Sequence, residues 1–289
     1  MAEIKVTGKL IPTPRKAANI YRLKTPNVTE RALRTLAKQM GMTADAKSAT
    51  LCSSADMLIW SEGHLELTAY RASGAIRFVD RSRWQIDDRK SNLKIQDGIA
   101  SRLALDLVKK MKLFPAREMQ FLKAARLNVG EATRAGKEAT ERTIDVAVAL
   151  QRLVDKIPVD GPGGKIIVYL DAQRSMSGLE IIWRQLGAAY RRNVPCRSPE
   201  AALRDLAAHY RSKEGIIEIE NVRFGYFEEG WKGSQQYLQP AYIFFGVLSS
   251  PDGTVRKRMI YVATALTKPV GRITPPLKRK LPQRSRPTR

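Results

Sequence analysis

Residues 143–183, TIDVAVALQRLVDKIPVDGPGGKIIVYLDAQRSMSGLEIIW, decide the fold class of this chain. Apolar residues alternate with polar or small ones over residues 144–150 and again over residues 165–170. A period of two residues is typical of a strand with one buried face. Residues 159–164, VDGPGG, lie between the two runs and are rich in turn formers, which predicts a hairpin connection. Residues 179–183 continue the pattern, so we predict an antiparallel meander.

Helix signals precede runs of this strand type. Asn27 with Glu30 three residues later fits a capping box, and the apolar stripe that follows stops at Gly41. Ser198, Pro199 and Glu200 match the preferences of a helix start. A further helix is predicted over residues 95–111. Strands are predicted over residues 19–23, 49–52, 57–60, 64–71, 75–80, 216–227, 237–248 and 256–264, while residues 117–142 fit helix, loop or strand.

An internal similarity links two of the predicted helices. Residues 30–37, ERALRTLA, and 200–207, EAALRDLA, agree at six of eight positions, and each precedes strand-like runs. Helical amphipathicity alone accounts for part of the match, but the shared order favours a duplication. The predicted fold is therefore α+β, with two helix-plus-antiparallel-meander units in tandem.

The charge is concentrated at the two ends of the chain. Lys and Arg number 51 against 28 Asp and Glu, a net charge of +23 over 289 residues. Residues 268–289 hold five prolines, eight basic residues and no acid, which predicts a disordered basic tail. We expect a basic N-terminal arm over residues 1–18, a first α+β unit over 19–115 and a second over 116–267.

Several phrases of the sequence resemble the PepSY-like and YycH/YycI-like group of bacterial proteins. They are KIPVDGPGGKIIVYLD at 156–171, GLEIIWR at 178–184, SPEAALRDL at 198–206 and YLQPAYIFFG at 237–246. The resemblance implies tandem PepSY-like domains that bind or regulate proteases, sensors or envelope partners without catalysis. Members of the group are mostly exported or membrane-tethered. The group has no catalytic signature, so it assigns no site residues here.

Features of a metal or nucleophile site are sparse. His64 and His209 are the two histidines, and Cys52 and Cys196 the two cysteines. No CxxC, HxxxH or HExxH spacing occurs, so we predict no metal and no cofactor. We expect both cysteines to be free, buried and structural, although one pairing between them stays open.

Two further patterns have both a structural and a functional interpretation. Gly161 to Lys165 would need a following helix to bind phosphate, but an apolar strand pattern follows, so we predict a turn. Paired carboxylates serve acid–base catalysis only if the fold brings them into one pocket. An enzyme with a cryptic carboxylate or Cys–His site therefore stays an alternative. The carboxylates in question are Asp87, Asp88, Asp155, Asp160, Asp171, Glu228 and Glu229.

Basic residues beside aromatic rings are the better candidates for binding. Such an arrangement holds phosphates while bases stack on the rings. For Trp84 and Trp183 themselves we favour a position in the core, with the neighbouring arginines in solvent. The tail has no core to join, so its cations either solubilise the chain or contact an anionic partner. The predicted anionic-partner residues are Arg81, Arg83, Arg184, Arg191 and Arg192, with Lys278, Arg279, Lys280, Arg284, Arg286 and Arg289 of the tail.

These patterns predict a non-catalytic binding or regulatory protein that engages an anionic macromolecule, either an acidic protein surface or nucleic acid. The alternative within the same chemistry is a nucleic-acid-binding protein that acts through non-specific phosphate contacts. No small-molecule substrate is evident. The longest apolar run, residues 240–248, is shorter than the roughly 20 residues of a membrane-spanning helix, and no signal-peptide pattern occurs. We therefore expect a cytoplasmic protein.

Overall fold

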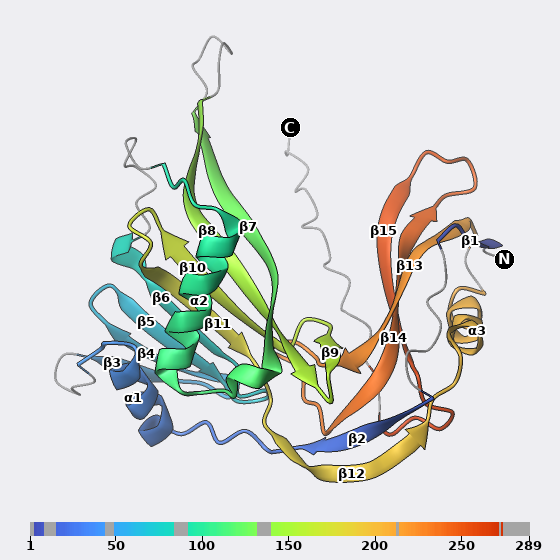
Figure 1. The fold of residues 1–289 in the computed structure, drawn as a ribbon, viewed down its shortest axis with the longest axis horizontal. Coiled ribbons are helices and arrows are strands. Elements are labelled where there is room, and N and C mark those ends of the chain that lie inside the picture. The colour runs from blue at the N-terminus through green and yellow to red at the C-terminus, as the bar shows by residue number, and fades with distance from the viewer. Residues whose placement is uncertain are drawn as a thin grey trace, which may run out of the picture. The chain divides into compact units, whose positions relative to one another are not determined.

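The computed structural model describes residues 3–8, 16–43, 49–83, 92–131, 140–211, 214–271 and 273. Of these residues, 51% lie in strands and 18% in helices. The described part of the chain has three α-helices and one mixed sheet of fifteen strands (Figure 1). The predicted tandem of helix-plus-meander α+β units is therefore wrong, whereas the prediction of predominantly antiparallel pairing is confirmed.

Long-range strand pairing explains this correction. β6 (Ile76–Asp80) pairs antiparallel with β11 (Met176–Ile182), so strands from both predicted units belong to one sheet. Residues 117–142, which fitted several structures in sequence, contain all of β7 (Met119–Glu131) and the start of β8 (Thr140–Val154). Because a sheet edge carries unpaired backbone groups, pairing two edges is favourable.

The chain divides into two compact units built from interleaved segments. Unit 1 comprises Met1–Asn19, Asn193–Phe224 and Gln239–Arg289, and unit 2 comprises Ile20–Arg192 and Gly225–Leu238. The sequence division predicted at residue 115 falls inside unit 2. Residues 274–289 of the predicted tail lie outside the described residues.

Unit 2 is built on an antiparallel sheet with the order β7-β8-β10-β11-β6-β5-β4-β3. The 72–74 turn between β5 and β6 is confirmed. β8 and β10 pair antiparallel as predicted, but residues 159 and 160 of their predicted connection belong to strand β9. The turn interpretation of residues 161–164 is also confirmed, because strand β10 follows at once. The remaining strands of this order are β3 (Thr50–Ser53), β4 (Met57–Glu62), β5 (Leu65–Tyr70) and β10 (Lys165–Asp171).

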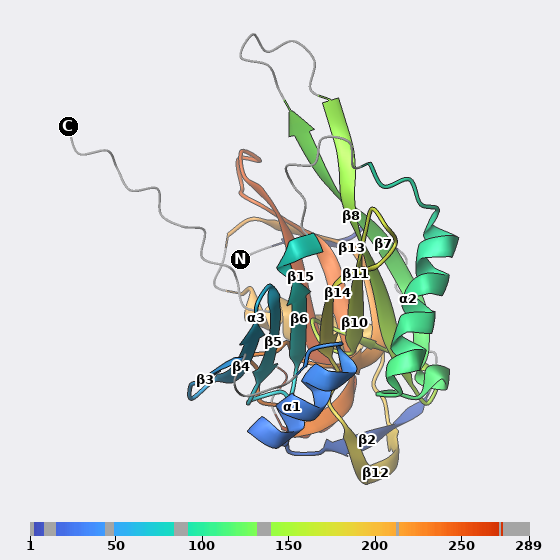
Figure 2. The same cartoon turned by 90° about the vertical axis from the view of Figure 1, so that its left-hand side faces the viewer.

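Two helices cover one face of this sheet (Figure 2). Helix α1 (Glu30–Gln39) packs on β4 and β5, and helix α2 (Asp97–Met111) packs on β7, β8 and β10. Alternate strand residues point to these helices and form the core, as the period of two predicts. They include Leu58, Trp60, Leu67, Phe78, Val148, Val168, Leu179 and Ile181.

Unit 2 also contains several shorter elements. They are the 3-10 turns η1 (Arg81–Arg83) and η2 (Ala116–Glu118), strand β9 (Ile157–Asp160), and the unit 2 parts of β2 (Ala17–Leu23) and β12 (Leu186–Pro195). Asp155 and Lys156 adopt positive φ in the tight turn between β8 and β9. The Tyr21 and Tyr226 hydroxyls both donate to the Asp155 carboxylate, at 2.8 and 3.2 Å, which fixes this turn.

Unit 1 combines strands with one helix. β1 (Glu3–Val6) pairs parallel with β13 (Ile216–Phe227), and β14 (Tyr237–Ser249) pairs antiparallel with β15 (Arg256–Thr264). Helix α3 (Pro199–His209) packs on β15, where the His209 and Tyr261 rings are 5.3 Å apart. The three strands predicted after this helix are confirmed. The proposed duplication stays a prediction, and its two copies are α1 in unit 2 and α3 in unit 1.

The helix starts test the capping predictions. Ser198 caps α3 by accepting a hydrogen bond from the Ala201 N–H at 3.2 Å, as predicted. Asn27 is not the cap of α1, because Thr29 adopts the extended cap conformation and accepts from the Ala32 N–H at 3.3 Å. The spacing of Asn27 and Glu30 fits a capping box, but a competing hydroxyl lies two residues later.

Cysteine and membrane predictions have mixed outcomes. Both cysteines are free, as predicted, but Cys52 is exposed on the short strand β3 and Cys196 is half-buried, so the prediction of burial is wrong for Cys52. No helix in the described residues is long and apolar enough to cross a bilayer.

Replacing the α1 cap tests its assignment. Thr29→Ala leaves one backbone N–H of the first turn without its acceptor and should lower the free energy of unfolding by about 1 kcal/mol. Asn27→Ala, two residues earlier, should change it by less than about 0.5 kcal/mol. Urea unfolding followed by circular dichroism measures both. An equal loss in the two variants would contradict Thr29 as the cap.

Candidate functional site

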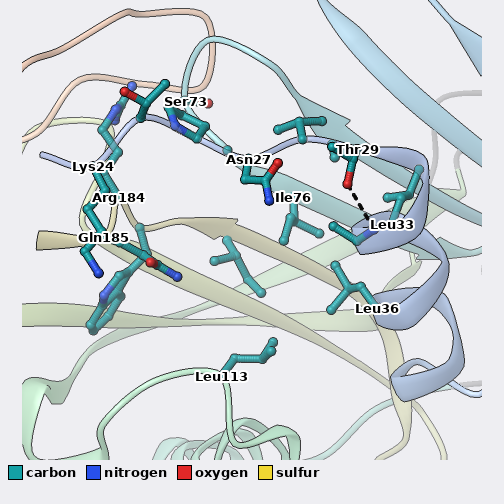
Figure 3. Close-up of a pocket in the computed structure, with 18 of the residues that line it drawn as sticks. Lys24, Asn27, Thr29, Leu33, Leu36, Ser73, Ile76, Leu113, Arg184 and Gln185 are labelled. Carbon is teal, nitrogen blue, oxygen red and sulfur yellow. Dashed lines mark hydrogen bonds between the residues drawn. The ribbon is translucent and has the colours of Figure 1, made fainter.

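A cavity of about 440 Å³ lies in unit 2, between α1 and the segment that follows α2 (Figure 3). Helix α1 packs mainly on β4 and β5, and helix α2 mainly on β7, β8 and β10, so β6 and β11 lie between the strands that the two helices cover most closely. We call this space the interhelix cavity. Figure 3 shows Leu113 across it from Asn27. Its main apolar lining is Leu33, Leu36, Ile76, Leu113, Phe114 and Trp183.

Trp183 is a fixed part of this lining. Its side chain is buried, which confirms the core interpretation of this tryptophan, whereas Trp84 lies outside the described residues. The Phe114 ring lies 4.9 Å from it, and the Arg152 guanidinium lies 4.7 Å from the centre of its ring. Contacts of both kinds hold an aromatic ring in one orientation.

A second cavity of about 770 Å³ adjoins the first and shares Lys24, Thr25 and Pro26 with it. Arg22 and residues 187–190 of β12 contribute further lining. We call it the cationic cavity, because Arg22 and Lys24 line it and neither has an ion-pair partner among the described residues. None of the described residues that line the two cavities is Asp or Glu.

Three of the predicted aromatic and basic residues lie at or next to the cationic cavity. Tyr190 of β12 lines it and is 45% exposed. The Tyr237 ring packs 4.9 Å from the Tyr190 ring, and the Arg191 guanidinium lies 5.3 Å from the centre of the Tyr190 ring. Arg191 and Arg192 follow directly along the strand and are both exposed. Sequence reasoning found this run but missed Arg22 and Lys24, although Arg22 directly follows Tyr21 in the same basic-aromatic pattern.

Arg184 was also predicted to bind an anionic partner. It is buried between the interhelix cavity, which it lines, and the 229–233 segment. Its guanidinium lies 3.3 Å from the Glu228 carboxylate and donates to the carbonyls of Glu229, Gly230 and Gly233 at 2.6–2.9 Å. With its charge compensated and 3% of its surface exposed, Arg184 holds a loop in place.

Glu228 is the fully buried centre of this ion-pair network. Burial raises the pKa of its carboxyl, while the Arg184 and Arg152 guanidiniums, the latter at 4.0 Å, act in the opposite direction. Burial also lowers the pKa of Arg152, whose second partner is Glu118 at 3.2 Å. Two cations and two carboxylates therefore balance each other in this network, of which Arg184 lines the interhelix cavity.

Arg81 and Arg83 lie elsewhere in unit 2, in η1. Arg81 pairs with Glu66, and Arg83 pairs with Asp80 at 3.1 Å and Asp171 at 2.9 Å. Each guanidinium thus has a carboxylate partner within the protein. The six predicted tail cations, from Lys278 to Arg289, lie outside the described residues.

The carboxylates singled out in the sequence do not meet in one cavity of the described structure. Asp171 binds Arg83, Asp155 accepts from two tyrosines, and Asp160 accepts from the Gln151 amide at 3.1 Å. Glu228 belongs to the network above, while Asp87 and Asp88 lie outside the described residues. No group of three or more His, Cys, Asp and Glu residues suited to a metal ion occurs in the described part.

Comparison with known proteins adds the fold alone. No protein-family model and no curated protein matches the chain. A solved structure, that of an uncharacterized protein from Eubacterium rectale ATCC 33656 at 1.45 Å resolution, is similar with a TM-score of 0.54 and 12% sequence identity. The match covers 94% of this chain and 90% of that one. The two chains therefore share a fold, and the PepSY-like resemblance stays a prediction.

The buried ion pair generates a stability prediction. Arg184→Met leaves Glu228 buried beside a weaker partner and should lower the free energy of unfolding by about 3–5 kcal/mol. Arg81→Met breaks an ion pair with a largely exposed arginine and should cost about 0–1 kcal/mol. Guanidinium chloride unfolding compares the two. Similar losses would contradict the assigned role of Arg184.

Asp145 generates a prediction for pH. It is buried, accepts from the Ser177 hydroxyl at 2.7 Å, and burial raises its pKa from 3.8 to about 6. Between these values the folded protein binds a proton that the unfolded chain does not, so stability rises as pH falls through 6 towards 4. From pH 7.5 to 4.5, wild type should gain about 1–3 kcal/mol relative to Asp145→Asn. Equal pH dependence in urea unfolding would refute this.

Proposed function

We propose that the chain is a non-catalytic binding protein and that unit 2 binds an anionic partner at the cationic cavity. The observation that supports this most is the lining of the two adjoining cavities. It contains Arg22 and Lys24 without an ion-pair partner among the described residues and includes no described Asp or Glu. A concave site that is lined by positive charges and no negative ones attracts anions over several ångströms.

The distribution of charge partners separates this site from the other predicted cations. Arg81, Arg83 and Arg184 each have a carboxylate within 4.0 Å, so their charges are compensated inside the protein. Arg191 and Arg192 are exposed and directly follow Tyr190, which lines the cationic cavity. An incoming anion gains most from cations that have not already been neutralised.

A non-catalytic role is supported by what surrounds the carboxylates. Asp155, Asp171 and Glu228 each bind a tyrosine or an arginine that orients the turn or the wall next to it. A general acid or base instead needs access to a substrate in a cavity. Neither cavity offers such a carboxylate among the described residues.

Nucleic acid is the second candidate partner, and one observation favours it. Tyr190 is 45% exposed, with the cation of Arg191 over its ring and the Tyr237 ring beside it. Single-stranded nucleic acid binds such platforms by stacking a base on the ring while the cations hold phosphates. Tyr190→Ala should then weaken binding of an oligothymidylate but not of an acidic peptide.

Anion binding is tested with two fluorescent probes, polyglutamate and oligothymidylate, followed by anisotropy. Both should bind less tightly as salt rises. Arg22→Gln/Lys24→Gln should weaken the tighter probe by about tenfold, because two unpaired cations are lost from the site.

The matched control removes the same charge from β15 of unit 1. Lys257→Gln/Arg258→Gln is exposed and lies outside both cavities, so it should change the affinity less than about twofold. Equal losses in the two double variants would show that net charge alone binds the probes, which would contradict a site at the cationic cavity.

A further inference from the structure

Residues 24–29 form a short segment that borders both cavities, between strand β2 and helix α1. Lys24, Thr25 and Pro26 line both cavities, and Asn27 to Thr29 line the interhelix cavity. Pro26 fixes its own φ and biases Thr25 towards an extended conformation. Thr29, at the end of the segment, is extended, with φ −119° and ψ 157°.

Two residues of this segment, Lys24 and Val28, are hydrogen-bonded to the protein through their backbone. The Lys24 N–H donates to the Gln185 carbonyl at 2.8 Å, and the Val28 carbonyl accepts from the Arg71 guanidinium at 3.2 Å. Thr25 and Asn27 make no hydrogen bond within the described residues, and both are exposed. In an extended chain, residues two apart present their backbone groups to the same side. Thr25 and Asn27 thus offer a free backbone edge.

A free extended edge selects a particular kind of ligand. Peptides bind such edges by backbone hydrogen bonds, and pockets beside the edge select alternate side chains. The interhelix cavity holds about 440 Å³, against roughly 150 Å³ for an apolar cavity that binds benzene. It has room for a bulky apolar side chain and part of its neighbour.

Building on the proposed function, we infer that the anionic partner is an extended acidic peptide segment that pairs with residues 24–28. One apolar side chain of the peptide fills the interhelix cavity, across which Leu113 faces Asn27 (Figure 3). Acidic residues of the same peptide lie in the cationic cavity beside Arg22 and Lys24. The shared wall at Lys24 to Pro26 keeps these two sites within a few residues of peptide.

A lipid-like carboxylate has the same combination of apolar body and anionic end, but it offers no backbone donors. It would leave the Thr25 and Asn27 groups to water, whereas a peptide satisfies them. The two ligands therefore differ in their dependence on the Asn27 N–H. Proline at residue 27 removes that N–H, and alanine keeps it.

The experiment starts from a random peptide library displayed on phage and selected against the full-length protein. The most enriched sequences should carry Phe, Leu or Trp with Asp or Glu two to four residues away. A fluorescein-labelled synthetic copy of the best sequence is then the probe for anisotropy, and dodecanoate is the lipid-like competitor.

Two pairs of variants test the inferred geometry. Leu113→Trp fills the interhelix cavity and should weaken the peptide by about tenfold, whereas Leu105→Trp, a half-buried leucine of α2 outside the lining, should change it less than about twofold. Asn27→Pro should weaken the peptide by about fivefold, and Asn27→Ala should change it less than about twofold. Circular dichroism and thermal unfolding check that each variant folds.

The outcomes separate this inference from the proposed function. If the anionic probes bind through Arg22 and Lys24 but neither Leu113→Trp nor Asn27→Pro weakens the selected peptide, the inference fails and anion binding stands. If dodecanoate binds and Asn27→Pro has no effect on any ligand, the partner is an amphipathic carboxylate instead. If Arg22→Gln/Lys24→Gln does not change the affinity for polyglutamate or for oligothymidylate, the proposed function itself fails.

Discussion

The pairing of β6 with β11 is the constraint on which the architecture of unit 2 depends. It joins Phe78 to Leu179 and Ile76 to Ile181, so apolar residues of two distant chain segments meet on one face. Each helix packs over strands on its own side of this seam. The interhelix cavity lies at this seam, where Ile76 and Ile181 of the paired strands face side chains of α1 and of the segment after α2. Those side chains are Leu33, Leu36, Leu113 and Phe114.

The buried pair of Arg184 and Glu228 fixes the wall of that cavity. Transferring both charges from water is costly, so such a pair is a weak source of net stability. Its geometric effect is stronger, because one guanidinium binds the carboxylate and three carbonyls at once. The 229–233 segment is thereby held against residues that follow β11. Arg184 follows Trp183 in the sequence and was predicted to be a surface cation. In the structure it is a buried residue that holds the 229–233 segment in place.

Local patterns in the sequence predict local structure well here. Period-two alternation locates the strands, and Ser198 with Pro199 locates the start of α3. The same patterns miss the single sheet, because the β6–β11 pairing joins residues about a hundred positions apart and neither strand signals its partner. They also miss both cavities, whose linings combine four or more chain segments. The prediction of Asn27 as the cap of α1 was wrong, because Thr29, two residues later, is also a suitable cap and is the one that the structure uses.

Charge becomes informative about function only after internal partners are assigned. In sequence, Arg81, Arg83, Arg184, Arg191 and Arg192 are equivalent cations beside aromatic residues. In the structure, the first three are neutralised by Glu66, Asp171 and Glu228, so their charges serve the fold. The last two lie exposed beside a cavity whose own cations have no described carboxylate partner. An anionic ligand is attracted by uncompensated charge. At the cationic cavity, that charge borders residues 24–28, whose Thr25 and Asn27 backbone groups make no hydrogen bond within the described residues.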